Sequence, residues 1–428
     1  MLSRSRSDGG PAAPTGWSIG EVRGFVGLLV VFQVLQGVFD RVPAGNVQFT
    51  DSYYLITYHH GFVRRGLLGQ LLRLIFGAPT RAEVDVTADI VVALAIGAVL
   101  LTAELLIRRG TAGSLAMAIL MVASPFTIDF AIVDRRPDLL ATVVLVALGI
   151  VLVKVSRALL AWLVVFGLGF AAMVLVHEDV ILVQVPWALV LVTVATLGRD
   201  REPDGDPRTG LARTLASRLG VLVVPPLMAT AALLAYGLPS SGRVRALESD
   251  VARYHFVGNT VFTYLPDSIA TAVRQVGAIP GTAKAVTLVL GLVLVALQAA
   301  GIAWWVRPRL WSTFTRRGHL ALGAGLSVLV LGTTALLFAT GFDWVRWFAD
   351  CGTSWLIVQA FTVLLDESTE ADSRAADTRS GPAVGRSEAA GRVHLSPWLP
   401  ALAVYLAVIP PLDVLFVTSQ LRHFLLGI

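Results

Sequence analysis

Long apolar runs separated by shorter polar segments dominate the chain from residue 22 onward. A helix that crosses the hydrocarbon core of a bilayer needs about 20 apolar residues, and this length predicts about eleven transmembrane helices. The predicted spans cover residues 22–39, 86–107, 113–133, 139–155, 158–176, 180–197, 219–238, 285–306, 320–340, 353–365 and 398–417. The pattern therefore predicts an all-α, polytopic integral membrane protein.

Polar stretches divide this pattern into four regions. Residues 1–20 are rich in Gly, Pro and Ser, and we expect a disordered cytoplasmic N-terminus there. Residues 21–365 hold ten of the spans and form the predicted transmembrane core. Residues 366–397 are poor in apolar side chains and are predicted to be a disordered cytoplasmic linker. Residues 398–428 then form a C-terminal transmembrane helix and tail.

The distribution of Lys and Arg orients the predicted helices. Cytoplasmic loops of membrane proteins carry an excess of these residues, and arginines are frequent at the N-terminus and in segments 198–218, 307–319 and 366–397. We therefore expect a multi-pass protein of the cell (plasma) membrane with a cytoplasmic N-terminus. The same topology places two long loops, 40–85 and 239–284, outside. Positive charge clustered on the outer side suggests an anionic ligand.

Composition supports the membrane class and excludes others. The 428 residues are 55% hydrophobic and only 15% charged, whereas soluble domains carry about 25% charged residues. The net charge of +5 comes without a basic aromatic groove or a nucleic-acid motif, so no nucleic-acid partner is predicted. Cys351 is the only cysteine, which excludes an internal disulfide and multi-cysteine metal sites.

The first outer loop combines chemically active side chains with an apolar anchor. It carries two acids, two tyrosines, two histidines and two arginines: Asp40, Asp51, Tyr53, Tyr54, His59, His60, Arg64 and Arg65. In the following residues 67–76, Leu67, Leu71, Leu74 and Ile75 share one helical face. This spacing predicts an interfacial helix that lies in the membrane surface. A simpler interpretation is an ordinary surface segment whose arginines reach lipid headgroups.

Four further polar clusters fall on the predicted outer side, at residues 134–138, 177–179, 254–255 within the loop 239–284, and 343–350. Each also has a purely structural interpretation, in which Asp138 caps a helix and Trp344 anchors a helix in the interface. The convergence of all these clusters on one side of the membrane is the strongest indication of function in the sequence.

The cluster at residues 177–179 contains potential metal ligands. Three consecutive residues at a helix end point in different directions, so they cannot complete a coordination sphere alone. A zinc site would require His59, His60 or His255 to lie alongside them. We therefore predict no metal and no cofactor, although a divalent metal is left open.

The chain begins with one span, continues with a long outer loop that holds a carboxylate and a surface-lying helix, and then has many more spans. Over about the first 200 residues this arrangement resembles the GT-C class of membrane glycosyltransferases. The segment Asp51-Ser-Tyr-Tyr54 is similar to an Asp-Glu-x-x-Tyr element in the first outer loop of those enzymes, with Ser52 where a second acid is common. Arg136-Pro-Asp138 is similar to an Arg-x-Asp element before the fourth span. His177-Glu178 resembles a basic and acidic pair at the outer end of a later span.

The resemblance implies an enzyme that takes a sugar from a polyprenyl-phosphate carrier. The acceptor would be a glycan, a lipid or a protein on the extracytoplasmic face, and residues 21–365 would be the catalytic core within the membrane lipid. Transfer needs a base for the acceptor hydroxyl and fixed positive charge for the departing phosphate.

Candidate residues exist for each of these roles. Asp51 is the expected base, with Asp40 as the second candidate. The expected donor-phosphate ligands are Arg64, Arg65, Arg135 and Arg136. The expected substrate contacts are Tyr54, His59, His60, Asp138, His177, Glu178, Asp343, Trp344 and Arg346.

Three other functions remain compatible with the sequence. A lipid-linked glycan transporter or flippase would use helix breaks such as Pro225-Pro226, but ionisable residues near the membrane midplane are nearly absent, which argues against ion coupling. A glycan polymerase or ligase would share the outer arginines. A non-catalytic assembly subunit would not need Asp51.

Overall fold

The computed structural model of the protein describes residues 16–41, 47–155, 158–199, 207–255, 260–279, 281–306, 314, 319–341, 343–378 and 393–408. Within these ranges the chain forms helices and one isolated bridge, between Trp17 and Val393, and no strand. The prediction of an all-α fold is confirmed for this part of the chain.

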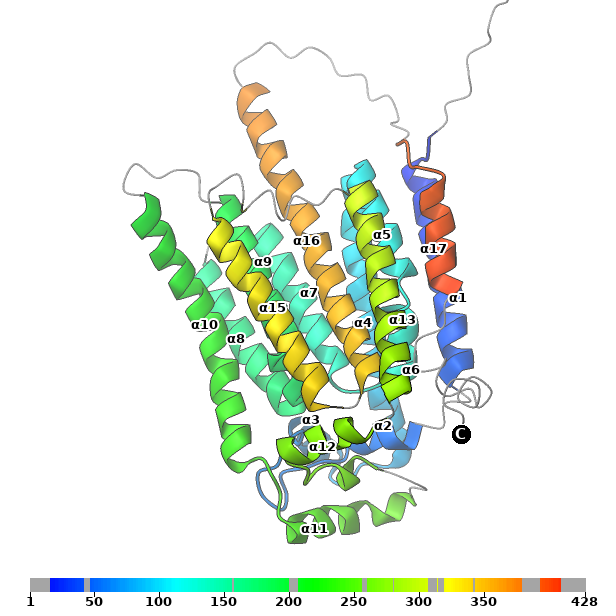
Figure 1. Cartoon of the computed structure of the whole chain (residues 1–428), viewed down its shortest axis with the longest axis vertical. Helices are drawn as coiled ribbons and strands as arrows, with labels where there is room; N and C mark the ends of the chain where they lie inside the picture. The colour runs from blue at the N-terminus through cyan, green and yellow to red at the C-terminus, as the bar shows by residue number, and fades with distance from the viewer. Residues whose placement is uncertain are drawn as a thin grey trace, which may run out of the picture.

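Long helices packed side by side build the body of the molecule (Figure 1). Among the described residues, nine helical segments are long and apolar enough to cross a membrane. They are formed by α1 (Ile19–Arg41), α4 (Arg81–Arg109), α5 (Ala112–Ala123) with α6 (Ile128–Asp134), α8 (Leu159–Val176), η1 (Glu178–Ile181) with α9 (Gln184–Arg199), α10 (Pro207–Tyr236), α13 (Gly281–Gly301) with η4 (Ile302–Val306), α15 (Leu320–Thr340) and α16 (Trp344–Thr378). The chain is therefore a multi-pass membrane protein that contacts membrane lipid.

Two of the predicted spans are shorter than the rest. The run 139–155 forms the 16-residue α7 (Leu139–Lys154), which is about 24 Å long at 1.5 Å per residue. The run 398–417 is described only as the 11-residue α17 (Trp398–Val408), and its remainder lies outside the described residues. The short run 353–365 belongs to α16, which begins at Trp344 and is long enough to cross.

Helix α16 extends beyond the predicted core. We expected a disordered linker from residue 366, but the helix reaches Thr378. Residues 366–378 contain three Ala and two Glu, which have high helix propensity, and neither Gly nor Pro, so the polarity of this stretch alone does not end the helix. The rest of the predicted linker to 392, the N-terminal residues 1–15 and the tail 409–428 lie outside the described residues.

The start of α1 and the segment before α17 meet at one end of the bundle. The N–H of Trp17 donates to the carbonyl of Val393 at 2.9 Å, and the reciprocal hydrogen bond is also 2.9 Å long. The predicted N-terminal region and the end of the predicted linker therefore lie on the same side, as the distribution of basic residues requires.

Short helices gather at the opposite end of the bundle (Figure 1). They come from the two loops predicted to lie outside: α2 (Val47–Tyr53), α3 (Leu67–Phe76), α11 (Ser241–Val251), η2 (Ala252–Tyr254), η3 (Val261–Thr263) and α12 (Ile269–Ala278). The two long loops thus share one end of the molecule, although they are far apart in the sequence.

Helix α3 has the bounds predicted for the interfacial helix. Leu71, Leu74 and Ile75 on its apolar stripe are 45%, 72% and 70% exposed, whereas Leu72 is buried. Ten helical residues extend only about 15 Å, which is too short to cross a bilayer. An exposed apolar face on a short helix suits contact with the membrane surface.

A glycine allows α3 to pack directly on the preceding loop. A Cβ atom at Gly69 would lie 2.0 Å from the carbonyl oxygen of Ile56 and 2.9 Å from that of Tyr54. We expect Gly69→Ala to displace α3 and to cost about 1–3 kcal/mol of stability, seen as a lower unfolding temperature of the purified protein in detergent.

Gly97 in α4 provides the matched control, since nothing lies within 4 Å of a Cβ atom there. Gly97→Ala should not lower the unfolding temperature, because alanine has the higher helix propensity. Equal unfolding temperatures for the two variants would contradict the close contact of α3 with residues 54–56.

Candidate functional site

A cavity of about 810 Å³ lies at the end of the bundle where the short helices gather. Its wall combines the first outer loop, the α6–α7 connection, the junction of α8 with η1, the loop before α12 and the start of α16. The charged or titratable residues that line it are Arg64, Arg65, Arg136, His177, Glu178, Asp179, Asp267, Asp343 and Arg346. Four arginines therefore face the same space as four carboxylates.

Arg65 and Glu178 form a bidentate ion pair on this wall. The Nε of Arg65 lies 2.9 Å from Oε2 of Glu178, and its Nη2 lies 2.5 Å from Oε1. Burial acts to lower the pKa of Arg65, but the charge of Glu178 outweighs it and raises that pKa. Arg65 has φ 63°, a left-handed conformation that costs a non-glycine residue roughly 1–2 kcal/mol. The ion pair helps to hold this backbone.

Arg136 joins the α6–α7 connection to the start of α16. Its Nη1 donates to Oδ2 of Asp343 at 2.8 Å, and its Nε lies 3.2 Å from Oδ1 of Asp134. Burial alone would raise the pKa of Asp343, but Arg136 and Arg346 hold it below its usual value. Asp343 is therefore a stable anion and a weak base.

Arg346 in the first turn of α16 is almost fully buried and touches three carboxylates. Its Nη1 lies 2.8 Å from Asp138, its Nη2 3.1 Å from Asp179, and its Nε 3.1 Å from Asp343. His177 extends this network, because its Nδ1 lies 2.6 Å from Oδ1 of Asp179. A buried guanidinium requires such partners, since the charge has lost its water.

The same network contains a group that could hold a metal ion. Asp138, His177 and Asp179 each offer a ligand atom, and these atoms lie within 4.8 Å of one another. Arg346 donates to Asp138 and contacts Asp179, so a fixed cation already neutralises the group. Asp138 is the neighbour of the 177–179 cluster here, in place of the outer-loop histidines considered from the sequence.

Arg64 is the most exposed of the four cavity arginines, with 19% of its side chain accessible against 15% for Arg65, 11% for Arg136 and 5% for Arg346. Its Nη2 donates to the carbonyl of Tyr264 at 2.5 Å, its Nε to the carbonyl of Leu265 at 2.9 Å, and its Nη1 lies 3.5 Å from Glu178. These contacts use three of the five N–H donors of the guanidinium among the residues that the structure describes. Burial lowers the pKa of Arg64 from its ordinary value, which reflects the cost of a charge that is only partly neutralised.

An apolar wall continues the cavity along the helices. Leu234 of α10 and Leu336 of α15 both line it and are 66% and 51% exposed. Both lie near the ends of predicted spans. The cavity therefore joins a charged end to exposed apolar side chains on two helices that are long enough to cross a membrane.

Tyr53 connects several of the charged groups. Its ring stacks on His177 with the centroids 5.8 Å apart. The guanidinium carbons of Arg65 and Arg136 lie 5.4 Å and 5.2 Å from the Tyr53 ring centroid, within cation–π range. The hydroxyl of Tyr53 also accepts from Arg65 at 3.2 Å. Tyr53 therefore holds both arginines in place.

Asp51, the predicted base, is not among the residues that line the cavity. It is buried beside Arg135, whose Nη1 lies 3.4 Å from its Oδ1. The same guanidinium reaches Asp89 at 2.8 Å and the carbonyl of Asp85 at 2.9 Å, both on α4. Arg135 has φ 51° and likewise does not line the cavity. Asp51 and Arg135 thus tie α2 to α4 behind the cavity wall.

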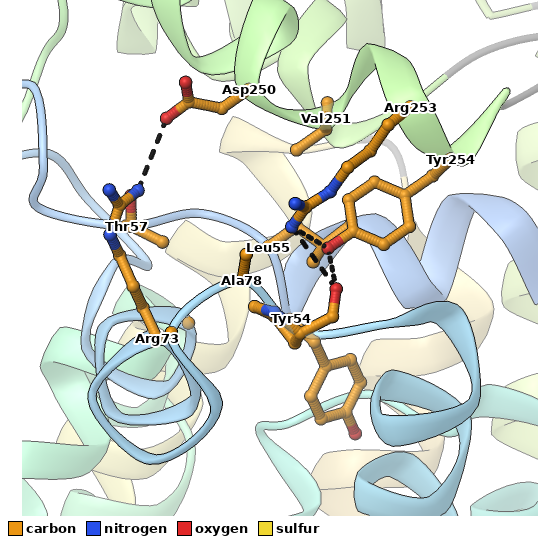
Figure 2. A pocket seen from close by; sticks show the side chains of 12 residues that line it. Tyr54, Leu55, Thr57, Arg73, Ala78, Asp250, Val251, Arg253 and Tyr254 are labelled. Atoms are coloured by element: carbon orange, nitrogen blue, oxygen red, sulfur yellow. Dashed lines mark hydrogen bonds and ion pairs between the residues drawn. The ribbon is translucent and has the colours of Figure 1, made fainter.

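Tyr54 faces away from its neighbour Tyr53. It is fully buried, and its hydroxyl donates to the carbonyl of Arg135 at 2.8 Å. It lines a separate cavity of about 170 Å³ between α3 and α11 (Figure 2). There Tyr254 donates to the carbonyl of Pro79, and Arg73 lies 3.5 Å from Asp250. These contacts connect the two outer loops.

The remaining predicted residues lie elsewhere. His59 and His60 are not in the lining of the larger cavity and face α11 instead. The indole of Trp344 donates to the carbonyls of Phe338 and Gly341 at 2.9 and 3.0 Å, which anchors the connection between α15 and α16. The side chain of Asp40 lies outside the described residues.

Several cavity residues were not singled out from the sequence. Asp267 and Tyr264 lie in a loop without regular periodicity, so only the tertiary fold brings them to the cavity. Trp347 lines the wall where Trp344 was expected.

Fold and cavity together define a polytopic all-α membrane protein with a charged chamber at one end of its helix bundle. The chain belongs to the family described as "Uncharacterised membrane protein Rv1490", whose model matches residues 24–239. This match covers Arg64, Arg136 and Glu178 but ends before Asp267 and Asp343. It supports the assignment to the membrane and names no activity.

Individual relatives extend the similarity to more of the chain. This chain is 26% identical over 356 residues to the uncharacterised protein Rv1490 of Mycobacterium tuberculosis strain H37Rv. The match covers 74% of this chain and 78% of the relative. The uncharacterised protein Mb1527 of Mycobacterium bovis matches to the same extent. No solved structure matches the chain.

The buried carboxyl of Asp51 generates a prediction about pH. Burial raises its pKa from 3.8 to about 6. Between these values the folded protein binds more protons than the unfolded chain, so the contribution of Asp51 to stability is present at low pH and is lost as the pH rises through about 6. We therefore expect Asp51→Asn, which stays uncharged, to become more stable relative to the parent as the pH rises from 4.5 to 7.5.

Unfolding temperatures of Asp51→Asn and of the parent between pH 4.5 and 7.5 measure this change in relative stability. The pKa shift of Asp51 limits the change to about 3 kcal/mol. Glu248→Gln on the exposed face of α11 is the control and should not change relative to the parent. A difference between Asp51→Asn and the parent that stays constant with pH would contradict the raised pKa.

Proposed function

We propose that this protein is a membrane glycosyltransferase that moves a sugar from a polyprenyl-phosphate carrier to an acceptor on the extracytoplasmic face. The observation that carries the proposal is the lining of the 810 Å³ cavity, which joins fixed arginines to an exposed apolar wall on α10 and α15. A substrate with a phosphate at one end and a hydrocarbon chain at the other fits both parts.

The apolar wall supports a lipid-linked substrate. Leu234 and Leu336 line the cavity and are exposed, and both belong to helices long enough to cross a membrane. A hydrocarbon chain lying along α10 and α15 would keep contact with the bilayer while its head enters the charged end. A soluble sugar nucleotide has no hydrocarbon chain that could contact this apolar wall.

The arginines support a phosphate in that head. Guanidinium groups bind phosphate oxygens through paired N–H donors, and Arg64 has the most exposed side chain of the four cavity arginines. Arg65, Arg136 and Arg346 lie 2.5, 2.8 and 2.8 Å from a carboxylate oxygen, whereas Arg64 makes a longer contact of 3.5 Å with Glu178. Arg64 is therefore the proposed ligand of the phosphate, and the other three shape the charged end around it.

The proposed reaction also needs a group that accepts a proton. The acceptor oxygen attacks the anomeric carbon, the bond from that carbon to the phosphate oxygen breaks, and polyprenyl phosphate leaves with the electron pair. The acceptor proton passes to the base. Asp267 suits this role, because its Oδ2 accepts from Gln275 at 2.8 Å and no arginine pairs with it among the described residues.

Asp51 is less suitable as the base in this geometry. A carboxyl group with a pKa of about 6 has the proton affinity that general bases need. However, it is buried behind the cavity wall with Arg135, and a base must come within hydrogen-bond reach of the proton that it removes. We therefore propose Asp267 in its place.

Binding of the carrier lipid tests the phosphate site. We expect the purified protein in nanodiscs to bind a polyprenyl monophosphate at least about tenfold more tightly than the uncharged polyprenol of the same length, since hydrogen bonds to charged groups contribute roughly 1.5–3 kcal/mol each. Arg64→Gln should remove most of this preference. Native mass spectrometry or displacement of a fluorescent lipid measures both affinities.

Arg245→Gln is the matched control, because Arg245 is exposed on α11 and does not line the cavity. It should keep the preference of the parent for the phosphate. If the parent binds the alcohol and the phosphate equally well, the proposed phosphate site is wrong.

Transfer itself tests the base. With a radiolabelled polyprenyl-phosphate sugar and membrane-derived acceptors, Asp267→Asn should lower transfer by about 10²–10⁴-fold and leave binding of the polyprenyl monophosphate unchanged. Glu248→Gln is the control with an equal change of charge. Parental transfer by Asp267→Asn would reject Asp267 as the base, and Asp51→Asn would then be examined in the same assay.

The same experiments separate the proposed enzyme from a transporter of lipid-linked glycans. Both would bind the polyprenyl phosphate, but a transporter would move the labelled lipid between leaflets with its sugar still attached. Lipid binding that depends on Arg64, together with lipid movement and no release of free carrier, would favour the transporter.

A further inference from the structure

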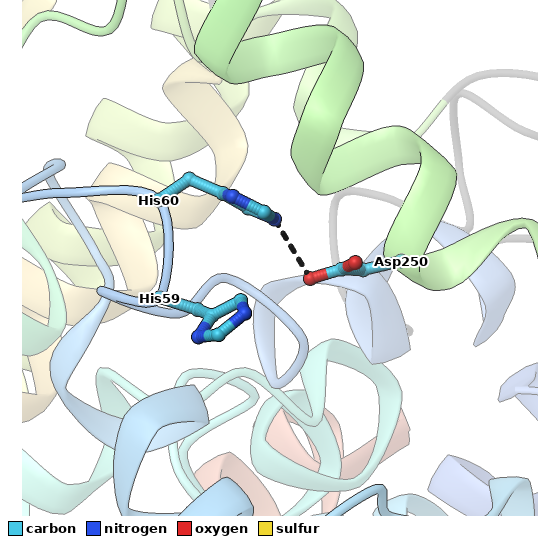
Figure 3. A group of neighbouring side chains, drawn as sticks. All are labelled: His59, His60 and Asp250. Carbon is cyan, nitrogen blue, oxygen red and sulfur yellow. Dashed lines mark hydrogen bonds and ion pairs between the residues drawn. The ribbon is translucent and has the colours of Figure 1, made fainter.

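Three metal-ligating side chains meet on the surface away from the large cavity. The Nε2 of His60 lies 3.0 Å from Oδ2 of Asp250, and the ring centroids of His59 and His60 are 4.8 Å apart. One ligand atom from each of the three residues lies within 4.8 Å of the other two. Figure 3 shows His60 directed at Asp250, with the ring of His59 beside them.

The local backbone explains how two consecutive histidines come together. The N–H of Gly61 donates to the carbonyl of Tyr58 at 3.0 Å, which closes a tight turn with both histidines at its centre. Gly61 has φ 110°, a conformation that glycine adopts without strain. Asp250 reaches the turn from the last residues of α11, 190 positions further along the chain.

We propose that His59, His60 and Asp250 form a site for a divalent metal ion of the Zn²⁺ class. Imidazole nitrogen and carboxylate oxygen are ordinary zinc ligands, with bonds of about 2.0–2.2 Å. In a tetrahedral site of that size, neighbouring ligand atoms are about 3.4 Å apart. The three side chains are exposed or half-buried, so small rotations can close the remaining distance. The fourth ligand is a water molecule or another oxygen donor.

The neighbouring positive charges set the conditions of binding. Arg73 lies 3.5 Å from the same Oδ2 of Asp250 that faces His60, and the metal ion takes over this contact. The side chain of Arg243 passes close to Gly61. Two neutral imidazoles and one carboxylate leave a bound Zn²⁺ with a net charge of +1, so these two arginines weaken the site without removing any of its ligands.

The metal ion would join the two outer loops. His60 lies four residues before Arg64, and Arg64 and Arg65 enter the cavity directly after this turn. A metal ion held between the turn and α11 would fix the start of this arginine segment against the second loop. This role does not depend on the reaction that the cavity performs.

Direct titration of the full-length protein with Zn²⁺ alone tests the site. The protein is prepared in detergent without a polyhistidine tag and freed of metal with a chelator, and affinity is measured by competition with a chromophoric chelator. We expect one Zn²⁺ ion per chain, and a loss of affinity of at least about tenfold for each of His59→Ala, His60→Ala and Asp250→Asn. His394→Ala, exposed near the other end of the bundle, is the control and should bind like the parent.

A second measurement guards against misfolded variants. Zn²⁺ should raise the unfolding temperature of the parent and of His394→Ala, because a ligand that binds only the folded state stabilises it. The three site variants should unfold at the parent's metal-free temperature, with no further rise on addition of Zn²⁺. No stoichiometric binding by the parent, or unchanged affinity in all three variants, would overturn the proposal.

Discussion

The buried guanidinium of Arg346 is the constraint on which the outer end of this molecule depends. It is almost inaccessible to solvent, and its charge is compensated by Asp138, Asp179 and Asp343. Removing one partner from such a group typically costs about 3–5 kcal/mol, because an uncompensated buried charge remains. The contacts join α16 to the start of α7 and to η1. The positions of the surrounding cavity residues therefore depend on the balance between the charge of Arg346 and the charges of its three carboxylate partners.

Two arginines on the loops around this centre hold left-handed backbones. Arg65 and Arg135 have φ values of 63° and 51°, and each makes strong ion pairs, with Glu178 and with the α2–α4 carboxylates respectively. The conformation is unfavourable for a residue with a Cβ atom, so these pairs stabilise a shape that the local sequence disfavours. Strained residues held in this way are concentrated at binding and catalytic sites.

The sequence was sufficient to predict most of the long helices and α3, but not which side chains face one another. Apolar runs mark the spans and the interfacial α3, because burial in lipid depends on local composition and length. Tyr53 and Tyr54 show why the directions of side chains could not be predicted from the sequence. They are adjacent, yet one faces the large cavity and the other the opposite cavity beside α11. The neighbouring Arg135 and Arg136 also point in different directions. Arg136 lines the cavity, whereas Arg135 is not in its lining and pairs with Asp51. The partner of Arg136, Asp343, is 207 positions away, a distance that no local pattern spans.

The near balance of arginines and carboxylates around the cavity has a consequence for how long any anion stays there. An incoming anion does not find bare positive charge, and it must compete with carboxylates that already contact the guanidinium groups. Its net gain is therefore the difference between two sets of similar contacts. When the anion leaves, the internal pairs close again and lower the barrier to its departure. Such a chamber favours rapid exchange of its occupant over tight retention, and it returns to the same resting state after each visit.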